Sequence, residues 1–328
     1  MSLDFRVKPE DDMISNFGHP RFFLFEGNML VNKKQNFLTA MALLIVPLVL
    51  FSFFVVFPVL RAAFYSLFKW NGLGALFGPN VGRKTKFLAL GNFKEILTDP
   101  IFWKAFVNNV KIIIFSLVIE LPIALILALN IFSKTRLNVA LRTIYFIPYV
   151  VSEVVAGTDW TFIYNPQYGL ANSFFAMFFP SGTDFAFLGR PETVFAAIFV
   201  VVIWKYFGLY MILYIAGLQG ISDDIREAAA IDGASPLQLN LFIIIPLLVP
   251  TIVVTMFFCI VGSLQTFDII WAMGQGDPVN AAETMVTYLY KFGFNRSQMG
   301  YGSATAIVIF VICVSFNAVY QKLINKGE

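Results

Sequence analysis

The sequence is poor in charged residues, in histidine and in cysteine. Asp, Glu, Lys and Arg make up 13% of its 328 residues, whereas 58% are hydrophobic, and a soluble domain carries about 25% charge. His19 is the single histidine, and both cysteines, Cys259 and Cys313, stand inside apolar runs. These scarcities argue against a zinc site, a disulfide framework and an intramembrane catalytic triad.

A Gly-Lys dipeptide is also missing, so the chain has no phosphate loop of the Walker A type. We therefore expect no catalytic residues, no bound cofactor and no metal in this chain, and we expect ATP and Mg to bind a separate ATPase subunit if ATP drives its activity. The net charge of +3 is small, and no basic patch alternates with aromatic residues. A nucleic-acid partner is therefore not expected.

Long uncharged runs dominate what is present. Residues 37–60 form 24 residues without a charge, and about 20 suffice to cross the hydrocarbon core. Similar runs, some with isolated ionisable residues, follow at 105–131, 143–163, 193–219, 241–264 and 303–320. The sequence thus predicts an all-α polytopic membrane protein with six transmembrane helices surrounded by lipid.

The polar connections define the expected organisation. We expect a tail at 1–36, a first helix at 37–60, an external loop at 61–104, a core at 105–320 and a second tail at 321–328. An amphipathic surface helix is expected over residues 93–103. We see no internal repeat, so an inverted-repeat carrier has no direct support.

Orientation depends on a short basic connector. The two sides carry nearly equal numbers of Lys and Arg, so the positive-inside rule discriminates weakly. Residues 133–142 form the shortest and most basic connector, with Lys134, Arg136 and Arg142. We place this side, and with it both termini, in the cytoplasm.

A polar, Ala-rich segment separates the fourth and fifth runs. Ser222 or Asp223 can cap a helix over residues 227–232, because Ala is the best helix former. Gly233 allows a turn or a close approach by another surface, and Pro236 can start a second short helix. A helix–turn–helix outside the bilayer suits docking onto another protein.

This segment, residues 221–242, resembles the cytoplasmic EAA loop of ATP-binding-cassette (ABC) importer permeases. The family pattern is Glu-Ala-Ala, three residues, Gly, nine residues, then Ile-x-Leu-Pro, and here Ile245 replaces the Leu. The matching positions and their neighbour Asp232 are Glu227, Ala228, Ala229, Asp232, Gly233, Ile243 and Pro246. The alternative interpretation is an ordinary interhelical loop that is rich in Ala.

Other segments resemble the carbohydrate branch of these permeases, which includes the larger maltose permease subunit. Gly274 and Asp277 depart from the Thr and second Gly of that branch. The resembling residues are Pro148, Trp160, Tyr168, Gly169, Leu170, Asn172, Phe267, Asp268, Gly276, Pro278, Glu283, Thr284, Tyr290, Phe294, Gly300, Tyr301 and Gly302.

The resemblance implies a type I importer permease in a bacterial inner membrane. A second, different permease subunit would complete the pathway, a cytoplasmic ATPase dimer would bind the EAA loop, and a solute-binding protein would deliver a sugar or oligosaccharide from outside. ATPase closure would rock the membrane helices from inward-facing to outward-facing.

Ionisable residues inside spans mark a cavity or an internal partner. We expect Glu153 and Lys205 either to pair or to line the substrate pathway. The pathway candidates, which include polar and aromatic side chains suited to sugars, are Glu153, Lys205, Tyr206, Tyr210, Ser263, Gln265, Thr266 and Asp268. If Lys205 lines the pathway and has no carboxylate partner, its positive charge would favour an anionic substrate.

Two alternative functions stay open at this point. One is an ABC permease for a solute other than sugar, such as glycerol phosphate, phosphate or polyamine, which would carry a similar loop. The other is an ATP-independent secondary transporter, which would need no nucleotide-binding subunit.

Overall fold

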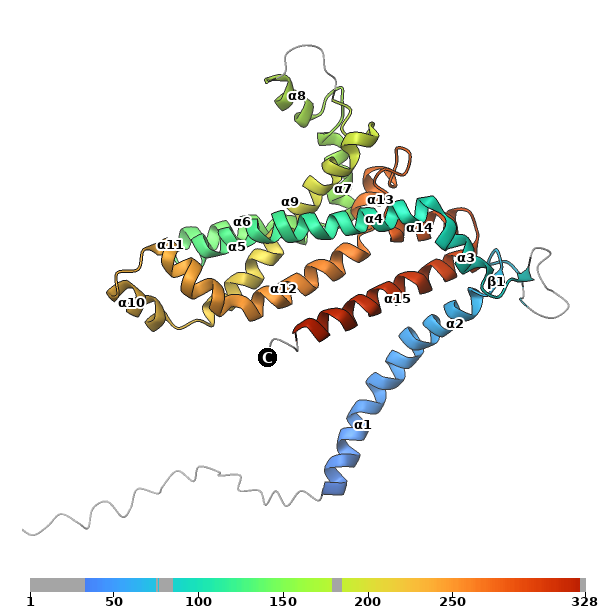
Figure 1. Ribbon diagram of the computed structural model, residues 1–328, viewed down its shortest axis with the longest axis horizontal. Helices are drawn as coiled ribbons and strands as arrows, with labels where there is room; N and C mark the ends of the chain where they lie inside the picture. The colour runs from blue at the N-terminus through green and yellow to red at the C-terminus, as the bar shows by residue number, and fades with distance from the viewer. Residues whose placement is uncertain (1–32, 75, 77–84, 179–184, 325–328) are drawn as a thin grey trace, which may run out of the picture. The chain divides into compact units, whose positions relative to one another are not determined.

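The computed structural model describes residues 33–74, 76, 85–178 and 185–324, and the chain divides into two compact units, Met1–Pro58 and Val59–Glu328. Nearly all regular structure within these residues is helical (Figure 1). The prediction of an all-α membrane protein is therefore confirmed.

The first membrane-spanning helix is longer than predicted. Helix α1 (Lys33–Phe51) continues through a π-helical turn, η1 (Ser52–Val56), into α2 (Phe57–Tyr65). The segment long and apolar enough to cross a membrane is Met41–Tyr65. Pro47 lies inside α1, where it removes one backbone donor without ending the helix.

Four further spans lie in the second unit. The first joins α4 (Pro100–Phe115), η2 (Ser116–Glu120) and α5 (Leu121–Ile131). The next is α9 (Pro191–Gln219), and the last is α15 (Met299–Ile324). Between these two, a 39-residue helical run consists of α11 (Pro236–Leu239), η3 (Asn240–Ile244), α12 (Ile245–Gln265) and α13 (Asp268–Gly274). About 20 residues cross the hydrocarbon core, so the ends of this run extend beyond it.

The predicted third span, residues 143–163, is broken. Helices α6 (Arg136–Val150) and α7 (Glu153–Ile163) meet at an angle of 96°. Val151 has an extended backbone, and Pro148 lies in the last turn of α6, so the helix ends before Ser152. The described residues thus hold five membrane-length helices, or six if this bent pair is one span.

Short elements connect the spans. They are β1 (Phe68–Lys69), β2 (Lys86–Phe87), α3 (Gly91–Thr98), α8 (Leu170–Ala176), α10 (Asp223–Ile231), α14 (Met285–Tyr290) and η4 (Lys291–Asn295). The strands pair antiparallel, with Phe68 opposite Phe87. The surface helix expected over residues 93–103 is in fact divided, because Asp99 caps α4 and Pro100 occupies its first turn.

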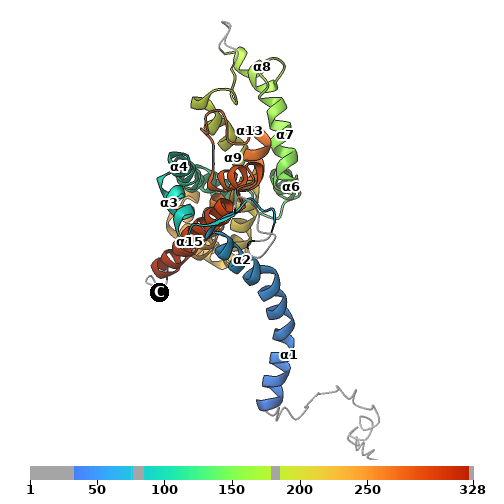
Figure 2. The same cartoon turned by 90° about the vertical axis from the view of Figure 1, so that its right-hand side faces the viewer.

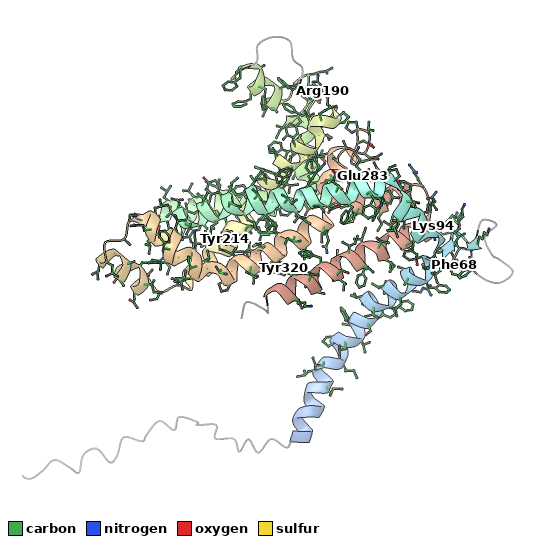
Figure 3. The ribbon with its side chains drawn as sticks, viewed as in Figure 1. Phe68, Lys94, Arg190, Tyr214, Glu283 and Tyr320 are labelled. Carbon is green, nitrogen blue, oxygen red and sulfur yellow. The ribbon has the colours of Figure 1, made fainter. Side chains whose placement is uncertain are left out.

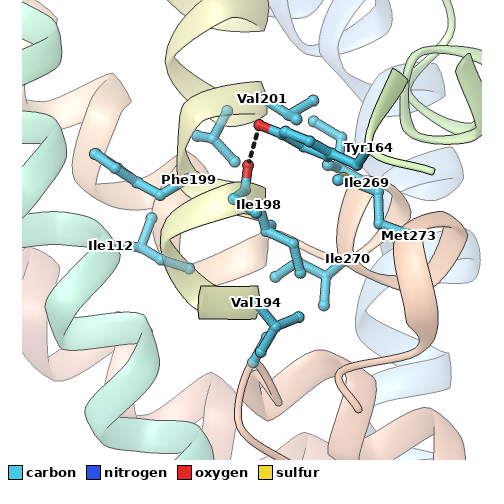
Figure 4. Close-up of a cluster of buried hydrophobic side chains, with 12 residues drawn as sticks. Ile112, Tyr164, Val194, Ile198, Phe199, Val201, Ile269, Ile270 and Met273 are labelled. Carbon is cyan, nitrogen blue, oxygen red and sulfur yellow. Dashed lines mark hydrogen bonds between the residues drawn. The ribbon is translucent and has the colours of Figure 1, made fainter. Parts of the chain in front are cut away.

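Three buried clusters hold the second unit together. One joins α9 to α13 and to Tyr164, whose hydroxyl donates to the carbonyl of Ala197 at 3.1 Å (Figure 4). Burial raises the pKa of Tyr164 to about 12, so this donor keeps its proton. A second cluster joins α5, α9 and α12, and a third joins α3, α4, α14 and α15.

Within the second unit, α10 and α11 lie at one end, and β1 and α3 lie at the opposite end (Figure 1). Figure 2 looks onto the end that carries α3 and the start of α15. The two ends therefore present different loops on the two sides of the bundle.

Candidate functional site

The segment between α9 and α12 folds as a capped helix–turn–helix. The Ser222 hydroxyl accepts from the backbone N–H of Asp224 at 3.2 Å, which begins α10. Ser235 and Gln238 form a reciprocal capping box, and Pro236 is the first residue of α11. The predicted Ser222 cap and Pro236 start are therefore confirmed.

Gly233 makes the turn between α10 and α11. Its φ is +78°, a region that an L side chain rarely adopts. A Cβ at this position would meet nothing within 4 Å in the chain itself. The backbone thus explains the glycine without reference to packing, and the space beside it is open to a partner.

Residues 221–242, which we name the coupling loop after the role that the resemblance implies, expose apolar side chains. Ile231 is 86% exposed and Leu237 is 67% exposed. Of the predicted motif residues, Ala229 is buried, whereas Glu227, Ala228, Asp232 and Pro246 are exposed. Apolar groups that gather on a polar loop indicate a protein contact surface.

Arg226 attaches α10 to the end of α5. Its guanidinium carbon lies 4.1 Å from the centre of the Phe132 ring, which is a cation–π contact. Its Nε is 3.8 Å from Asp223 within the same helix. Arg142 of α6 binds the same end of α5, because its guanidinium donates to the carbonyls of Ile131 at 2.8 Å and Ser133 at 2.9 Å. The coupling loop is thereby joined to a membrane helix.

Lys205 fills the break between α6 and α7. Its ammonium donates to the carbonyls of Pro148 at 3.0 Å, Tyr149 at 2.9 Å and Val151. These carbonyls lose their helical partners where α6 ends, and the helix C-terminus favours a cation. Lys205 is 2% exposed, and an ammonium has three donors, so no donor is left for a substrate.

The expected pair of Lys205 with Glu153 is not formed in the described structure. Glu153 accepts instead from the Tyr206 hydroxyl at 2.5 Å, which ties α7 to α9. Tyr210, one turn further along α9, is buried in the cluster with α5 and α12. The sequence identified Glu153 and Lys205 as ionisable residues within spans. It could not show that α6 ends early and leaves carbonyls to which Lys205 donates.

The remaining pathway candidates separate into two groups at the end of α12 that leads into α13. Ser263 and Thr266 are buried and donate to carbonyls one turn earlier, Cys259 at 2.8 Å and Gly262 at 3.1 Å. Gln265 and Asp268 are exposed where α12 meets α13. These last two side chains are free to contact a ligand.

Two neighbouring asparagines inside α4 were missed by the sequence reasoning. Asn108 donates to the carbonyls of Ala281 and Glu283, both at 2.9 Å, and Asn109 donates to that of Ser263 at 2.8 Å. They fix the loop before α14. Adjacent amides inside an apolar run are a signal that could have identified them, because buried amides need partners.

The same loop holds a buried ion pair outside the spans. Lys291 lies 2.6 Å from Glu283 and 3.2 Å from Asp277. Burial raises the pKa of Glu283, and the nearby Lys291 ammonium opposes that rise. No group of His, Cys, Asp and Glu within the described residues could hold a metal ion.

Five or six membrane-length helices within the described residues, with a helix–turn–helix between α9 and α12, define a multi-pass membrane protein. Residues 120–326 match the family described as binding-protein-dependent transport system inner membrane component, and the chain belongs to that family. It is therefore a permease subunit of an ABC importer.

Its relatives include permeases for several solutes. The chain is 32% identical to the probable ABC transporter permease YurN of Bacillus subtilis over 87% of its own length and 96% of the relative. It is 31% identical to the trehalose/maltose transport system permease MalF of Thermococcus litoralis, with 88% and 93% covered. A solved bacterial alginate ABC transporter, in complex with an alginate pentasaccharide-bound periplasmic protein, contains a chain of the same fold, with a TM-score of 0.74, 22% identity and 90% and 96% covered.

Proposed function

We propose that this chain forms, with a second and different permease subunit, the pathway of a sugar or oligosaccharide importer. The relatives named for trehalose/maltose and for multiple sugars support this substrate class. A solute-binding protein delivers the substrate on the outer side, and a separate cytoplasmic ATPase dimer binds ATP and Mg. Both termini lie in the cytoplasm of a bacterial cell with the coupling loop.

The observation that carries the proposal is the turn at Gly233. It combines a positive φ, open space and the exposed neighbours Ile231 and Leu237 on a rigidly capped loop. A surface of this kind suits insertion into a cleft of an ATPase subunit. Arg226 and Phe132 then provide a contact through which α10 moves α5.

Gly233→Asp tests this account. The left-handed backbone costs a non-glycine residue about 1–2 kcal/mol, and the side chain meets nothing inside the chain. We expect normal amounts of protein in the membrane, but at least a tenfold loss of uptake and of substrate-stimulated ATP hydrolysis, because the added side chain obstructs the ATPase contact.

Gly274→Asp is the matched control. Gly274 also has a positive φ, +147°, and open space around it, but it lies at the end of α13. We expect this variant to keep ATPase association. Wild-type uptake and stimulated hydrolysis in Gly233→Asp would refute the docking account.

Glu153, Tyr206, Gln265 and Asp268 are our candidates for the substrate pathway, because each has a polar side chain that is at least partly exposed. The relatives also include an sn-glycerol-3-phosphate permease of Brucella abortus, 30% identical over 75% of this chain. Substrate-stimulated ATP hydrolysis with neutral oligosaccharides, acidic oligosaccharides and glycerol phosphate distinguishes these substrates. Membership of a binding-protein-dependent family argues against an ATP-independent carrier.

A further inference from the structure

A pocket of about 1150 Å³ lies at the end of the second unit opposite α10 (Figure 1). Its walls come from residues 69–71 and 85–86 around the β1–β2 pair, from Glu95 of α3, and from residues 296–298 before α15. Apart from Tyr301 at the start of α15, the lining residues lie outside the membrane-length helices. The pocket therefore opens into the aqueous phase or the membrane surface on that side.

The pocket is rich in unpaired positive charge. Lys69, Lys86 and Arg296 line it together with one carboxylate, Glu95. Within the described residues none of these four groups forms an ion pair. Arg296 instead rests 4.1 Å from the centre of the Phe292 ring. The charge of the lining thus favours an anionic ligand.

Two lining residues have buried donor groups without a partner. The indole Nε1 of Trp70 and the hydroxyl of Thr85 make no hydrogen bond within the described structure. An indole N–H can only donate, so its missing partner is an acceptor. Both atoms are covered by the surrounding chain, so the case for an anionic ligand rests on Lys69, Lys86 and Arg296.

The pocket wall is rigid and attached to α15. The N–H of Gly300 donates to the carbonyl of Trp70 at 2.9 Å, and a Cβ on Gly300 would lie only 1.8 Å from the carbonyl oxygen of Phe68. Asn92 fixes the same strand by donating to the carbonyls of Ser66 at 2.7 Å and Phe68 at 3.0 Å. Such a wall loses little entropy when a partner binds.

A hydrogen-bond chain leads from the wall to two other elements. The Tyr301 hydroxyl lies 2.5 Å from that of Tyr288 in α14, and Tyr288 donates to Asp99 at 2.5 Å. Asp99 in turn accepts from Ile101 and so caps α4. An event at the pocket therefore reaches α4, α14 and α15 through direct contacts.

We propose that this pocket is a docking site for the solute-binding protein and takes carboxylate side chains from an acidic part of its surface. The inference rests on the proposed function, which places this end of the bundle outside the cell. Complementary charge at such a contact steers encounter and sets the register of the two proteins.

Two other ligands must be compared with a protein carboxylate at this lining. A sugar site needs open aromatic faces, but the Trp70 ring packs 4.8 Å from Tyr65 and Tyr301 is 6% exposed. A lipid headgroup needs an apolar surface beside it for the acyl chains, and the exposed Leu73, Phe87 and Leu90 provide one next to the lining, so an anionic lipid is the competing ligand that the experiment separates. Protein carboxylates require neither feature.

The test uses the complete importer in nanodiscs of neutral lipid, with ATP hydrolysis measured against the concentration of substrate-loaded binding protein. Lys86→Glu should raise the half-saturating concentration ~10-fold and weaken its dependence on salt, because a steering charge is reversed. Glu95→Gln should lower that concentration by about threefold, because it removes the negative charge of the lining that repels carboxylates. Basal hydrolysis stays at the wild-type value in both variants.

Lys94→Glu is the matched control, since Lys94 is exposed on α3 but does not line the pocket (Figure 3). Equal half-saturating concentrations for Lys86→Glu and Lys94→Glu would overturn the docking site. An effect of Lys86→Glu that arises only in discs with anionic lipid would also overturn it, in favour of a headgroup site. Failure of the proposed function is distinguishable, because the wild-type importer would then not respond to binding protein at all.

Discussion

At the scale of single residues, Lys205 shows how a charge is accommodated inside a membrane span. Its stem is buried along α9, and its ammonium replaces the helical partners of three carbonyls at the end of α6. A single side chain from a neighbouring helix therefore pairs with the carbonyls that the bend between α6 and α7 leaves free.

Lys205→Met should destabilise the protein by about 2–3 kcal/mol, because the apolar replacement leaves buried carbonyls unpaired. The measurement is thermal unfolding of the purified permease in detergent. Lys111→Met is the control, since Lys111 is exposed on α4 and its ammonium lies 5.4 Å from the centre of the Phe195 ring. Equal melting temperatures for the two variants would contradict a clamping role for Lys205.

Some residue roles followed from the sequence and others did not. Ser222 and Pro236 were predicted because a helix cap and a first-turn proline depend only on neighbouring residues. The sequence left two roles open for Lys205, a pair with Glu153 or a place in the pathway, and it could not show the carbonyls freed by the break at Val151 that Lys205 contacts instead. The roles proposed for Glu227, Gln265 and Asp268 stay predictions.

At the scale of helices, contacts among α5, α6 and α10 connect the coupling loop to a membrane-length helix. Arg142 of α6 holds the backbone of α5, whereas Arg226 of α10 holds the Phe132 ring. The second contact is the weaker of the two, and it is the one that crosses from the loop to the span. In the proposed mechanism it is therefore the contact whose loss should uncouple the loop from the span.

Arg226→Ala should leave the ATPase bound but lower the amount of substrate imported per ATP hydrolysed about fivefold, because α10 could then move without α5. Uptake and hydrolysis measured in the same proteoliposomes give this ratio. Arg136→Ala removes an exposed arginine from α6 and serves as the control. An unchanged ratio in Arg226→Ala would exclude this contact as the route of coupling.

Hydropathy predicted most of the helices. It misplaced helix ends that are set by capping residues, prolines or tertiary contacts. The division of residues 93–103 at Asp99 and Pro100 was readable as an N-cap followed by a first-turn proline. The 96° bend between α6 and α7 was not readable, because apolar composition continues through it. The direction of a chain after a break is set by tertiary contacts such as those of Lys205.

At the scale of the whole molecule, the two ends of the second unit differ in chemistry. One end exposes the apolar side chains of the coupling loop, and the other presents the cationic pocket beside β1 and α3. An importer needs this asymmetry, since a motor binds on one side and a carrier of substrate on the other. The nearly equal Lys and Arg content of the two sides could not establish which end faces the cytoplasm.

Labelling of single-cysteine variants establishes directly which end of the second unit faces the cytoplasm. In a background with Cys259→Ala and Cys313→Ala, Lys134→Cys should react with an impermeant maleimide only in inverted vesicles, and Lys94→Cys only in right-side-out vesicles. Both lysines are exposed, Lys134 in the connector before α6 and Lys94 on α3. Because the contact of Arg226 with Phe132 puts that connector beside the coupling loop, the opposite labelling pattern would place the loop outside the cell, where no ATP-driven motor could reach it.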